Sequence, residues 1–142
     1  MSYPLPRFQF QVEFDNEPIG FAEVSGLGAE ISVIEYREGS DVEQTPRKFP
    51  GMTKYHDVKL SRGIAAGDNR LFEWFDSVKV GSIERRSVAI KLLNEDREPA
   101  VVWKLQNAFP TKLTAQDLDA TANEVAIEEL VLCHEGLTIE QA

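Results

Sequence analysis

The sequence has very little of what disulfide bridges, metal centres and membrane spans require. One cysteine among 142 residues, Cys133, excludes an internal disulfide, and its place in the apolar run 130–133 predicts a small buried side chain. Apolar runs are only a few residues long, whereas a membrane-spanning helix needs about 20. The first residues lack the pattern of a secretory signal. We therefore expect a protein that is made in the cytoplasm and has no membrane anchoring.

Basic residues are scarce as well. The chain has 15 Lys and Arg against 24 Asp and Glu, which gives a net charge of −9 at pH 7. This charge opposes binding to the phosphates of nucleic acids or to anionic lipids, so we expect no stable nucleic-acid binding. The hydrophobic content of 42% and the charged content of 27% are ordinary for a globular protein. Residues 1–142 are therefore predicted to form a single domain with a real core.

Residues of the kinds that do chemistry are few and poorly placed. The only histidines, His56 and His134, show no zinc-ligand spacing, and residues 133–135 would alternate between the two faces of one predicted strand. The carboxylates of 117–119 could serve a magnesium or acid–base site, but a solvated turn is the favoured reading. We expect no catalytic residue, no cofactor and no metal, and hence no enzyme.

Most of the chain shows the pattern of β-strands. Phe8, Phe10, Val12 and Phe14 alternate with polar residues, which is typical of a strand with one buried face. A turn at 15–18 joins it to a short second strand. The predicted strands are 8–14, 19–24, 31–37, 55–62, 83–93, 100–107 and 125–135, with Phe109-Pro110 ending the sixth and turn chemistry at 94–99 making a hairpin of the fifth and sixth.

One helix of about three turns is predicted over 68–78. Asp68 is a good N-cap, and the apolar face would consist of Leu71, Phe72, Phe75 and Val78. Together the elements predict a mainly β (α+β) fold, an antiparallel β-sandwich or partly open barrel with one packed α-helix. Adjacent apolar residues such as 101–103 indicate strands covered on both faces, with the second cover supplied by the helix or by another subunit.

Two features indicate contacts with other molecules. The stretch 39–53 has no usable periodicity, and so long a loop is uncommon in a compact domain unless it binds something. The loop residues that we assign to an intermolecular contact are Asp41, Glu43, Arg47, Lys48 and Phe49, which include the basic pair Arg47 and Lys48.

A second basic pair, Arg85 and Arg86, consists either of exposed solubilising charges or of subunit contacts.

Short motifs follow one another along nearly the whole chain, at 34–39, 48–52, 58–63, 71–75 and 107–110. Further motifs are Arg85-Arg86, Leu93-Asn94-Glu95, Trp103 and 123–128. In this order and spacing they resemble the phage tail tube protein family, in the version found in the inner tubes of extracellular contractile injection systems.

The resemblance implies a hexameric ring in which each subunit adds strands to a continuous inner β-barrel. Stacked rings would form a tube inside a contractile sheath, and the loop 39–53 would reach the adjacent ring. The implied partners are further copies of the chain, sheath and baseplate proteins, and a cargo effector or DNA in the lumen. The implied location is an extracellular particle or virion tail after cytoplasmic assembly. The alternatives left open are a ring-forming secreted carrier of type VI systems, a virion tail tube that conducts DNA, and a small enzyme with an unrecognised site.

Overall fold

The computed structural model describes residues 4–40, 46–79 and 81–141, which form ten strands and one helix. Seven strands were predicted, so the described part of the chain is richer in strands than its sequence indicates. In chain order the elements are β1 (Phe10–Phe14), β2 (Glu17–Ile19), β3 (Glu23–Ser25), β4 (Ala29–Tyr36), β5 (Arg47–Tyr55), β6 (Val58–Gly63), α1 (Arg70–Lys79), β7 (Arg86–Leu93), β8 (Pro99–Ala115), β9 (Ile127–Cys133) and β10 (Gly136–Gln141).

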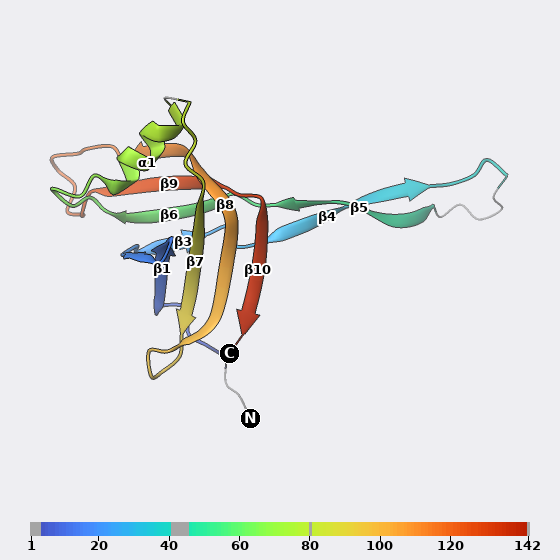
Figure 1. Cartoon of the computed structure of the whole chain (residues 1–142), viewed down its shortest axis with the longest axis horizontal. Helices are drawn as coiled ribbons and strands as arrows, with labels where there is room; N and C mark the ends of the chain where they lie inside the picture. Colours follow the sequence, from blue (N-terminus) through green and yellow to red (C-terminus); the bar gives the residue numbers. More distant parts are fainter. Residues whose placement is uncertain (1–3, 41–45, 80, 142) are drawn as a thin grey trace.

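All strand pairs are antiparallel, and eight of the strands form one sheet. The order is β2-β1-β7-β8-β9-β6-β3, with β10 added on β8, while β4 and β5 form a separate two-stranded sheet. The strands β1, β7 and β10 run across the direction of β6 and β9, and α1 lies beside the β6–β9 half (Figure 1). The sheet bends without closing on itself, which confirms the mainly antiparallel fold with one packed helix.

The first hairpin forms as predicted, but its return strand does not: the predicted strand 19–24 is replaced by β2, which pairs with β1, and by β3, which pairs with β6. In β1 the side chains of Val12 and Phe14 are buried, and β2 pairs with it through a two-residue turn. Both turn residues, Asp15 and Asn16, have positive φ (49° and 69°), the conformation that tight hairpins require and that Asn and Asp tolerate. The predicted strand started too early, because Phe8 lies before β1 and is 73% exposed.

The strand β8 was predicted to stop at Phe109-Pro110 and instead continues to Ala115. Its first half pairs with β7 and β10, and its second half is the outer strand of the β8-β9-β6-β3 part of the sheet. Pro110 lies opposite Leu132, next to a register shift in an outer strand, where a missing N–H breaks little. Asn107, with a φ of 52°, bends the strand between its two halves.

The helix α1 buries Leu71 as predicted, but its second buried residue is Trp74 and not Phe72. Leu71 and Trp74 are the buried residues, whereas Phe72 is 49% exposed. The indole of Trp74 packs 5.0 Å from the ring of Phe14 and donates a hydrogen bond of 2.7 Å to the carbonyl oxygen of Glu84. Asp68 holds the start of the helix by accepting a hydrogen bond from the backbone N–H of Arg70 (3.3 Å), in line with its predicted capping role.

An ion-pair network centred on the buried Arg62 ties this helix start to the sheet. The guanidinium of Arg62 is 7% exposed and contacts the carboxylates of Asp68 (2.9 Å) and Glu128 (2.7 Å). Arg70 contacts Asp68 at 2.9 Å and also reaches Glu17 on β2. Hydrogen bonds from Arg70, together with those from Arg62, lower the pKa of Asp68 far below its usual range. The network thus joins β2, β6, β9 and α1.

The predicted last strand, 125–135, corresponds to β9, which ends at Cys133, a residue that is only partly buried. A further strand that was not predicted, β10, follows and continues in the same direction along β8. His134, between the two strands, is buried, and its ring nitrogens lie 3.1 Å from the carbonyl oxygen of Gly136 and 3.0 Å from that of His56. The alternation of Leu137 and Ile139 with polar neighbours was the sequence signal for β10 that the strand prediction overlooked.

Candidate functional site

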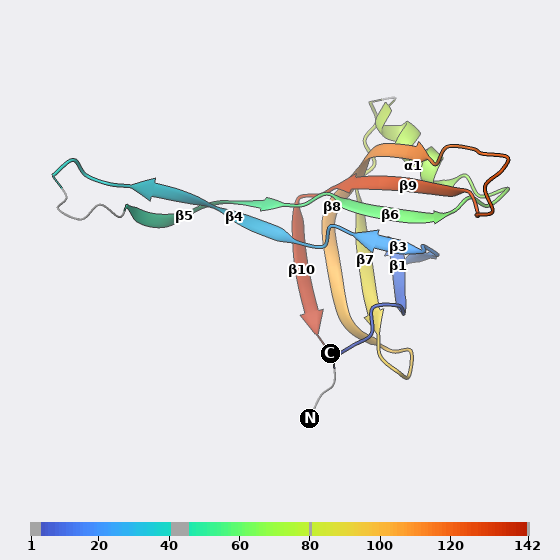
Figure 2. The same cartoon turned by 180° about the vertical axis from the view of Figure 1, so that it is seen from behind.

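The strands β4 and β5 form an arm that projects away from the body of the molecule (Figures 1 and 2). The prediction of a structureless loop over 39–53 is wrong for its second part, because β5 occupies Arg47–Tyr55 and pairs with β4 along its length. Pro50 is tolerated because β5 has β4 as its only strand neighbour among the described residues. The periodicity was missing because neither face of this hairpin is buried in the single chain.

Both faces of the arm carry apolar side chains. Residues that pair across the two strands share a face, so Ile34 and Phe49 lie on one face and Val33 and Pro50 on the other. Every residue of β4 is exposed. The large apolar side chains of the arm, between 49% and 83% exposed, are Ile31, Val33, Ile34, Tyr36, Phe49 and Met52. An apolar patch of this kind marks a protein–protein interface.

Three of the five predicted contact residues lie on the described part of the arm. Arg47 pairs with Tyr36, Lys48 with Glu35 and Phe49 with Ile34. All three of these β5 residues are exposed. The other two, Asp41 and Glu43, lie outside the described residues. The arm therefore brings the predicted basic pair and its aromatic neighbour together on consecutive positions of one strand.

The foot of the arm is fastened to the body. The backbone N–H of His56, just after β5, donates to the carbonyl of Gly28, just before β4, at 3.1 Å. The carbonyl of His56 in turn contacts the buried ring of His134, which packs against Tyr55 with ring centroids 5.6 Å apart. Gly26 has a φ of 87° and lies so close to the carbonyl of Asp57 that a Cβ atom would collide with it. The direction in which the arm leaves the body is thus set by close contacts at its base.

The second predicted basic pair is engaged within the chain. Arg85 contacts the carboxylate of Glu135 at 2.9 Å and lies 4.9 Å from the ring centroid of Phe109. Arg86 contacts Glu84 at 3.1 Å and lies 5.0 Å from the ring of Trp74. Both arginines therefore support the body at the bend of the sheet, and their predicted role in subunit contacts stays a prediction.

Open strand edges are the second candidate for assembly. β10 has β8 as its neighbour on one side, and on the opposite side of the same half-sheet β2 covers only Val12–Phe14 of β1. Ile139 on β10 is 57% exposed although its pairing partner Trp103 packs against the core. Unpaired edges with exposed apolar side chains are templates for pairing with another chain.

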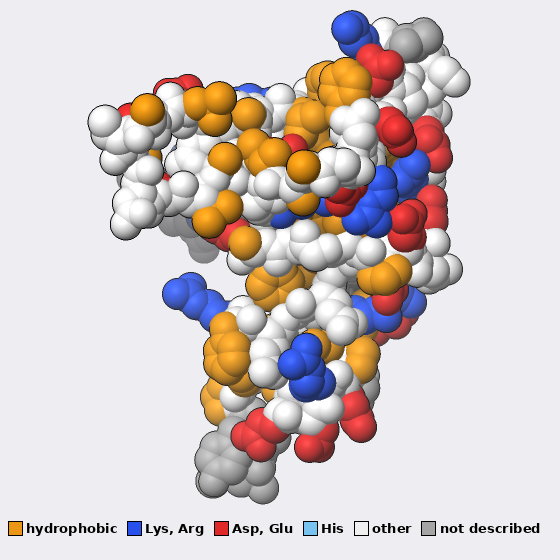
Figure 3. Space-filling view, turned by 90° about the vertical axis from the view of Figure 1, so that its left-hand side faces the viewer, with side chains coloured by type: hydrophobic (Ala, Val, Ile, Leu, Met, Phe, Trp, Pro, Cys, Tyr) orange, Lys and Arg blue, Asp and Glu red, His pale blue; other side chains and the backbone are white. Residues whose placement is uncertain are grey.

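The opposite end of the molecule from the arm is hollowed. A cavity of about 590 Å³ lies between the β1–β7–β8 part of the sheet and β3. Figure 3 views the molecule from this end and shows hydrophobic side chains in the waist between its upper and lower parts. The apolar residues that line the cavity include Phe8, Phe10, Leu27, Ile90, Leu92 and Trp103.

Within the described residues, no group of three or more His, Cys, Asp or Glu side chains could hold a metal ion. Asp119, one of the two carboxylates of 117–119, accepts hydrogen bonds from the backbone and hydroxyl of Thr121, which lower its pKa. This arrangement matches the solvated turn that the sequence favours. In the part of the chain that the structure describes, no helix has the length and apolar character to cross a membrane.

Open strand edges and an arm exposed on both faces are typical of a protein that assembles with further chains. The pattern of the T4-like virus tail tube protein gp19 family matches residues 6–138, and the chain belongs to this family of tube proteins. The family assignment confirms the resemblance seen in the sequence.

Solved structures give the same result. The chain is similar to one in the sheath–tube complex of the extracellular contractile injection system PVC, with 33% identity, a TM-score of 0.90, and coverage of 99% of this chain and 93% of that one. It is also similar to one in the cap that terminates the tube of the anti-feeding prophage AFP (35% identity, TM-score 0.91, 100% and 94% coverage). Hcp1 from Flavobacterium johnsoniae shares the fold alone, at 15% identity and a TM-score of 0.62 over 95% and 97% of the two chains. No curated protein sequence matches the chain.

Proposed function

We propose that the chain is the repeating subunit of the inner tube of an extracellular contractile injection system. Six copies form a ring, rings stack into a hollow tube, and contraction of a surrounding sheath drives the tube through a target envelope with its cargo. The observation that carries this proposal is the identity of 33–35% to chains of PVC and AFP particles over nearly the whole length. The subunit acts mechanically, and no catalytic residue takes part.

The ring follows from the two open edges of the sheet. β10 of one copy pairs with the edge formed by β1 and β2 of the next, so that both edges of this half-sheet are satisfied in the closed ring. This contact covers Ile139, which is exposed in the single chain. Because the two edges differ, the contact is head-to-tail and closes after six equal rotations. The result is a continuous barrel built from strands of all six copies.

The arm provides the contacts that the ring does not. Its two apolar faces need two covering surfaces, and a stacked tube offers both a lateral neighbour and an adjacent ring. Arg47 and Lys48 meet carboxylates of the next ring, because a chain with a net charge of −9 presents many of them. Asp41 and Glu43 belong to the same contact. Arg85 and Arg86 make secondary contacts with a neighbouring subunit while they keep their ion pairs with Glu135 and Glu84 of their own chain.

The partners of the assembled tube are the sheath around it and the baseplate at its end. Solved chains similar to this one occur in structures of a PVC sheath–tube complex and of an AFP baseplate, the latter at 28% identity. Assembly takes place in the cytoplasm, and the tube leaves as part of the released particle. A virion tail tube that conducts DNA is the second candidate, because the matching family is described from a T4-like virus. The type VI carrier is disfavoured, since the likeness to Hcp1 lies at the level of the fold.

Electron microscopy and mass measurement of the purified chain test this proposal. Six-fold rings or tubes are the expected result, and mass photometry should give multiples of six chains. A compact monomer at every protein concentration, salt and pH tried would contradict it. Particles isolated through a tag on the chain then separate the two candidates, because a sheathed tube without a capsid supports the injection system, and a capsid supports the virion tail.

A further inference from the structure

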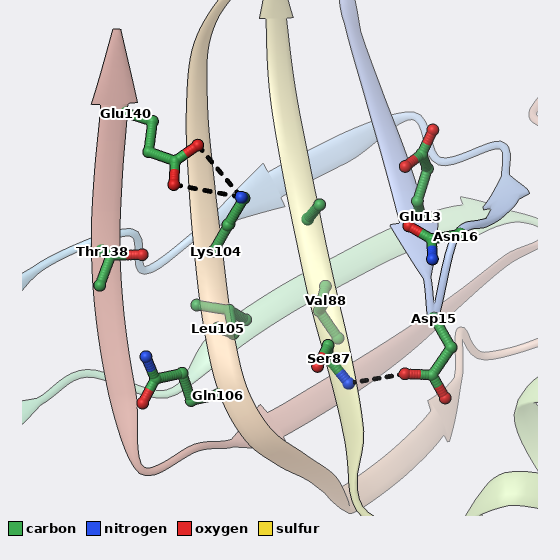
Figure 4. A pocket seen from close by; sticks show the side chains of 11 residues that line it. Glu13, Asp15, Asn16, Ser87, Val88, Lys104, Leu105, Gln106, Thr138 and Glu140 are labelled. Carbon is green, nitrogen blue, oxygen red and sulfur yellow. Dashed lines mark hydrogen bonds and ion pairs between the residues drawn. The ribbon is translucent and has the colours of Figure 1, made fainter.

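One face of the β1–β7–β8–β10 half-sheet is polar and open. Along these strands the alternate side chains Val12, Val88 and Leu105 are buried in the core. Their neighbours point to the other face, where Figure 4 shows polar and charged side chains around a shallow trough of about 620 Å³. The registers place side chains of all four strands in level rows on this face, for example Glu13, Ala89, Lys104 and Thr138.

The charges on this face are paired across strands. The ammonium of Lys91 on β7 contacts the carboxylate of Glu13 on β1 at 3.1 Å, and that of Lys104 on β8 contacts Glu140 on β10 at 3.1 Å. Each pair joins a lysine to a carboxylate on the neighbouring strand, two residues along that strand from the position directly opposite the lysine. Asp15, at the end of β1, accepts a hydrogen bond from the backbone N–H of Ser87. On this face the acidic and basic groups nearly cancel, although the chain as a whole carries −9.

Resting on the proposed function, we propose that this face is the wall of the tube channel, and that Glu13 and Glu140 mask its lysines so that the wall holds no charged polymer. Six copies per ring and many rings repeat each charge along the channel. Unmasked lysines would bind a polyanion at many points at once, and free carboxylates would hold a cationic polypeptide in the same way. A paired wall lets polypeptide cargo of either charge slide past it. The two glutamates therefore keep the channel passable for cargo of either charge.

Cysteine labelling tests whether this face lines the channel. In a Cys133→Ala background, Thr138→Cys places a thiol at an exposed position of this face, on its edge strand β10, and Glu73→Cys places one on α1, away from it. In assembled tubes, a small maleimide should label both thiols, whereas a maleimide coupled to a large dextran should label only position 73. Equal labelling of the two thiols by the large reagent would overturn the inference. Tubes that never form would instead contradict the proposed function itself.

Charge variants test the masking. Glu13→Gln with Glu140→Gln frees two lysines per chain and keeps the side-chain shapes, and Glu73→Gln with Asp76→Asn makes the same change in net charge on α1. Tubes of the first variant should bind a labelled single-stranded oligonucleotide at least about tenfold more tightly than wild type, with an affinity that falls steeply as salt rises. The α1 variant should change binding by less than about threefold, because its charges are spread on an outer surface in water.

The mirror variant, Lys91→Gln with Lys104→Gln, should gain affinity for labelled oligolysine under the same conditions. If the variant that lacks Glu13 and Glu140 fails to assemble, the variant that lacks the two lysines still tests the same ion pairs. The masking role of Glu13 and Glu140 would be overturned if the wall variants bound both polymers no more tightly than wild type does. It would also be overturned if the wall and α1 variants changed binding equally.

Discussion

Ile34 and Phe49 face each other across the two strands of the arm, and each leaves about half of its side chain exposed, 54% and 49%. Two large apolar residues in register, each left half uncovered by its own chain, are typical of a protein–protein interface. The arm therefore separates two properties that core residues combine. In the proposed tube, its side chains would contribute little to the stability of the subunit and much to the stability of the assembly.

The first prediction is that Phe49→Ser shortens tubes without unfolding the subunit. In the single chain the change should alter the free energy of unfolding by less than about 1 kcal/mol, because the side chain is half exposed. In the tube, burying it contributes on the order of 1–2 kcal/mol per copy. Circular dichroism measures the first effect and electron microscopy of tube length the second. Leu118→Ser, an exposed apolar residue outside the arm, is the control and should leave tube length unchanged.

The second prediction concerns the core contact of α1. Trp74→Ala should destabilise the subunit by about 3–5 kcal/mol, because it empties a buried site beside Phe14 and leaves the carbonyl of Glu84 without its donor. Phe72→Ala, two residues away on the exposed side of the helix, should cost less than about 1 kcal/mol. Urea denaturation followed by fluorescence of Trp103, or by circular dichroism, measures both. Equal losses for the two variants would contradict the assignment of the buried face.

This helix also shows how far sequence reasoning reaches. The helix, its start at Asp68 and its buried Leu71 could be predicted from spacing and capping chemistry. The choice between Phe72 and Trp74 could not, because both are apolar and lie within one turn of Leu71. The structure decides it through partners that are distant in the sequence, the ring of Phe14 and the carbonyl of Glu84.

The arm and β8 were misjudged for two different physical reasons. Alternation of apolar and polar residues identifies a strand such as β1, because one face of the strand is buried and the other is exposed to solvent. β5 shows no alternation, because both of its faces are exposed in the single chain. β8 was predicted to end at Phe109-Pro110, because proline has no N–H to donate within a sheet. Pro110 lies on an outer strand, where it is tolerated. The family resemblance indicated the contact role of the arm, and only the structure revealed its hairpin.

The third prediction is a pH dependence that originates at Asp68. Its pKa in the folded protein lies well below the value of about 3.9 expected in the unfolded chain. At a pH between these two pKa values, Asp68 is protonated in the unfolded chain and ionised in the folded protein. Its contribution to the free energy of unfolding is therefore fully present above about pH 4 and is lost as the pH falls through the folded pKa. Asp68→Asn should destabilise the subunit by roughly 1–3 kcal/mol at pH 7, since Arg62 is buried and loses a charged partner.

Urea denaturation from pH 7 down to pH 2.5 checks this prediction. The wild type should lose stability below about pH 4 more steeply than Asp68→Asn, so the two curves should approach each other at low pH. Glu73→Gln on the exposed side of the same helix is the control and should run parallel to wild type. Parallel curves for Asp68→Asn as well would show that the network around Arg62 does not depend on this carboxylate.

The last prediction is that the basic pair of the arm holds one ring on the next. Arg47→Glu with Lys48→Glu reverses two exposed charges on β5 while leaving the apolar residues of the arm in place. Each exposed ion pair contributes only about 0–1 kcal/mol, but six copies act together at every ring junction, and the reversal adds repulsion from an already acidic neighbour. Stacking should therefore weaken far more than folding. Single rings, whose contacts are the strand edges, should still form.

Two measurements separate these effects. Thermal unfolding of the double variant should stay within a few degrees of wild type, because neither side chain is buried in the subunit. Electron microscopy should show short tubes or free rings, and raising the salt should narrow the difference, since screening weakens the repulsion. Lys79→Glu with Lys112→Glu makes the same charge change outside the arm and should leave tube length near normal. Normal tubes from the arm variant would refute the role of Arg47 and Lys48 in stacking, whereas a collapsed melting temperature would show that these residues serve the fold of the subunit.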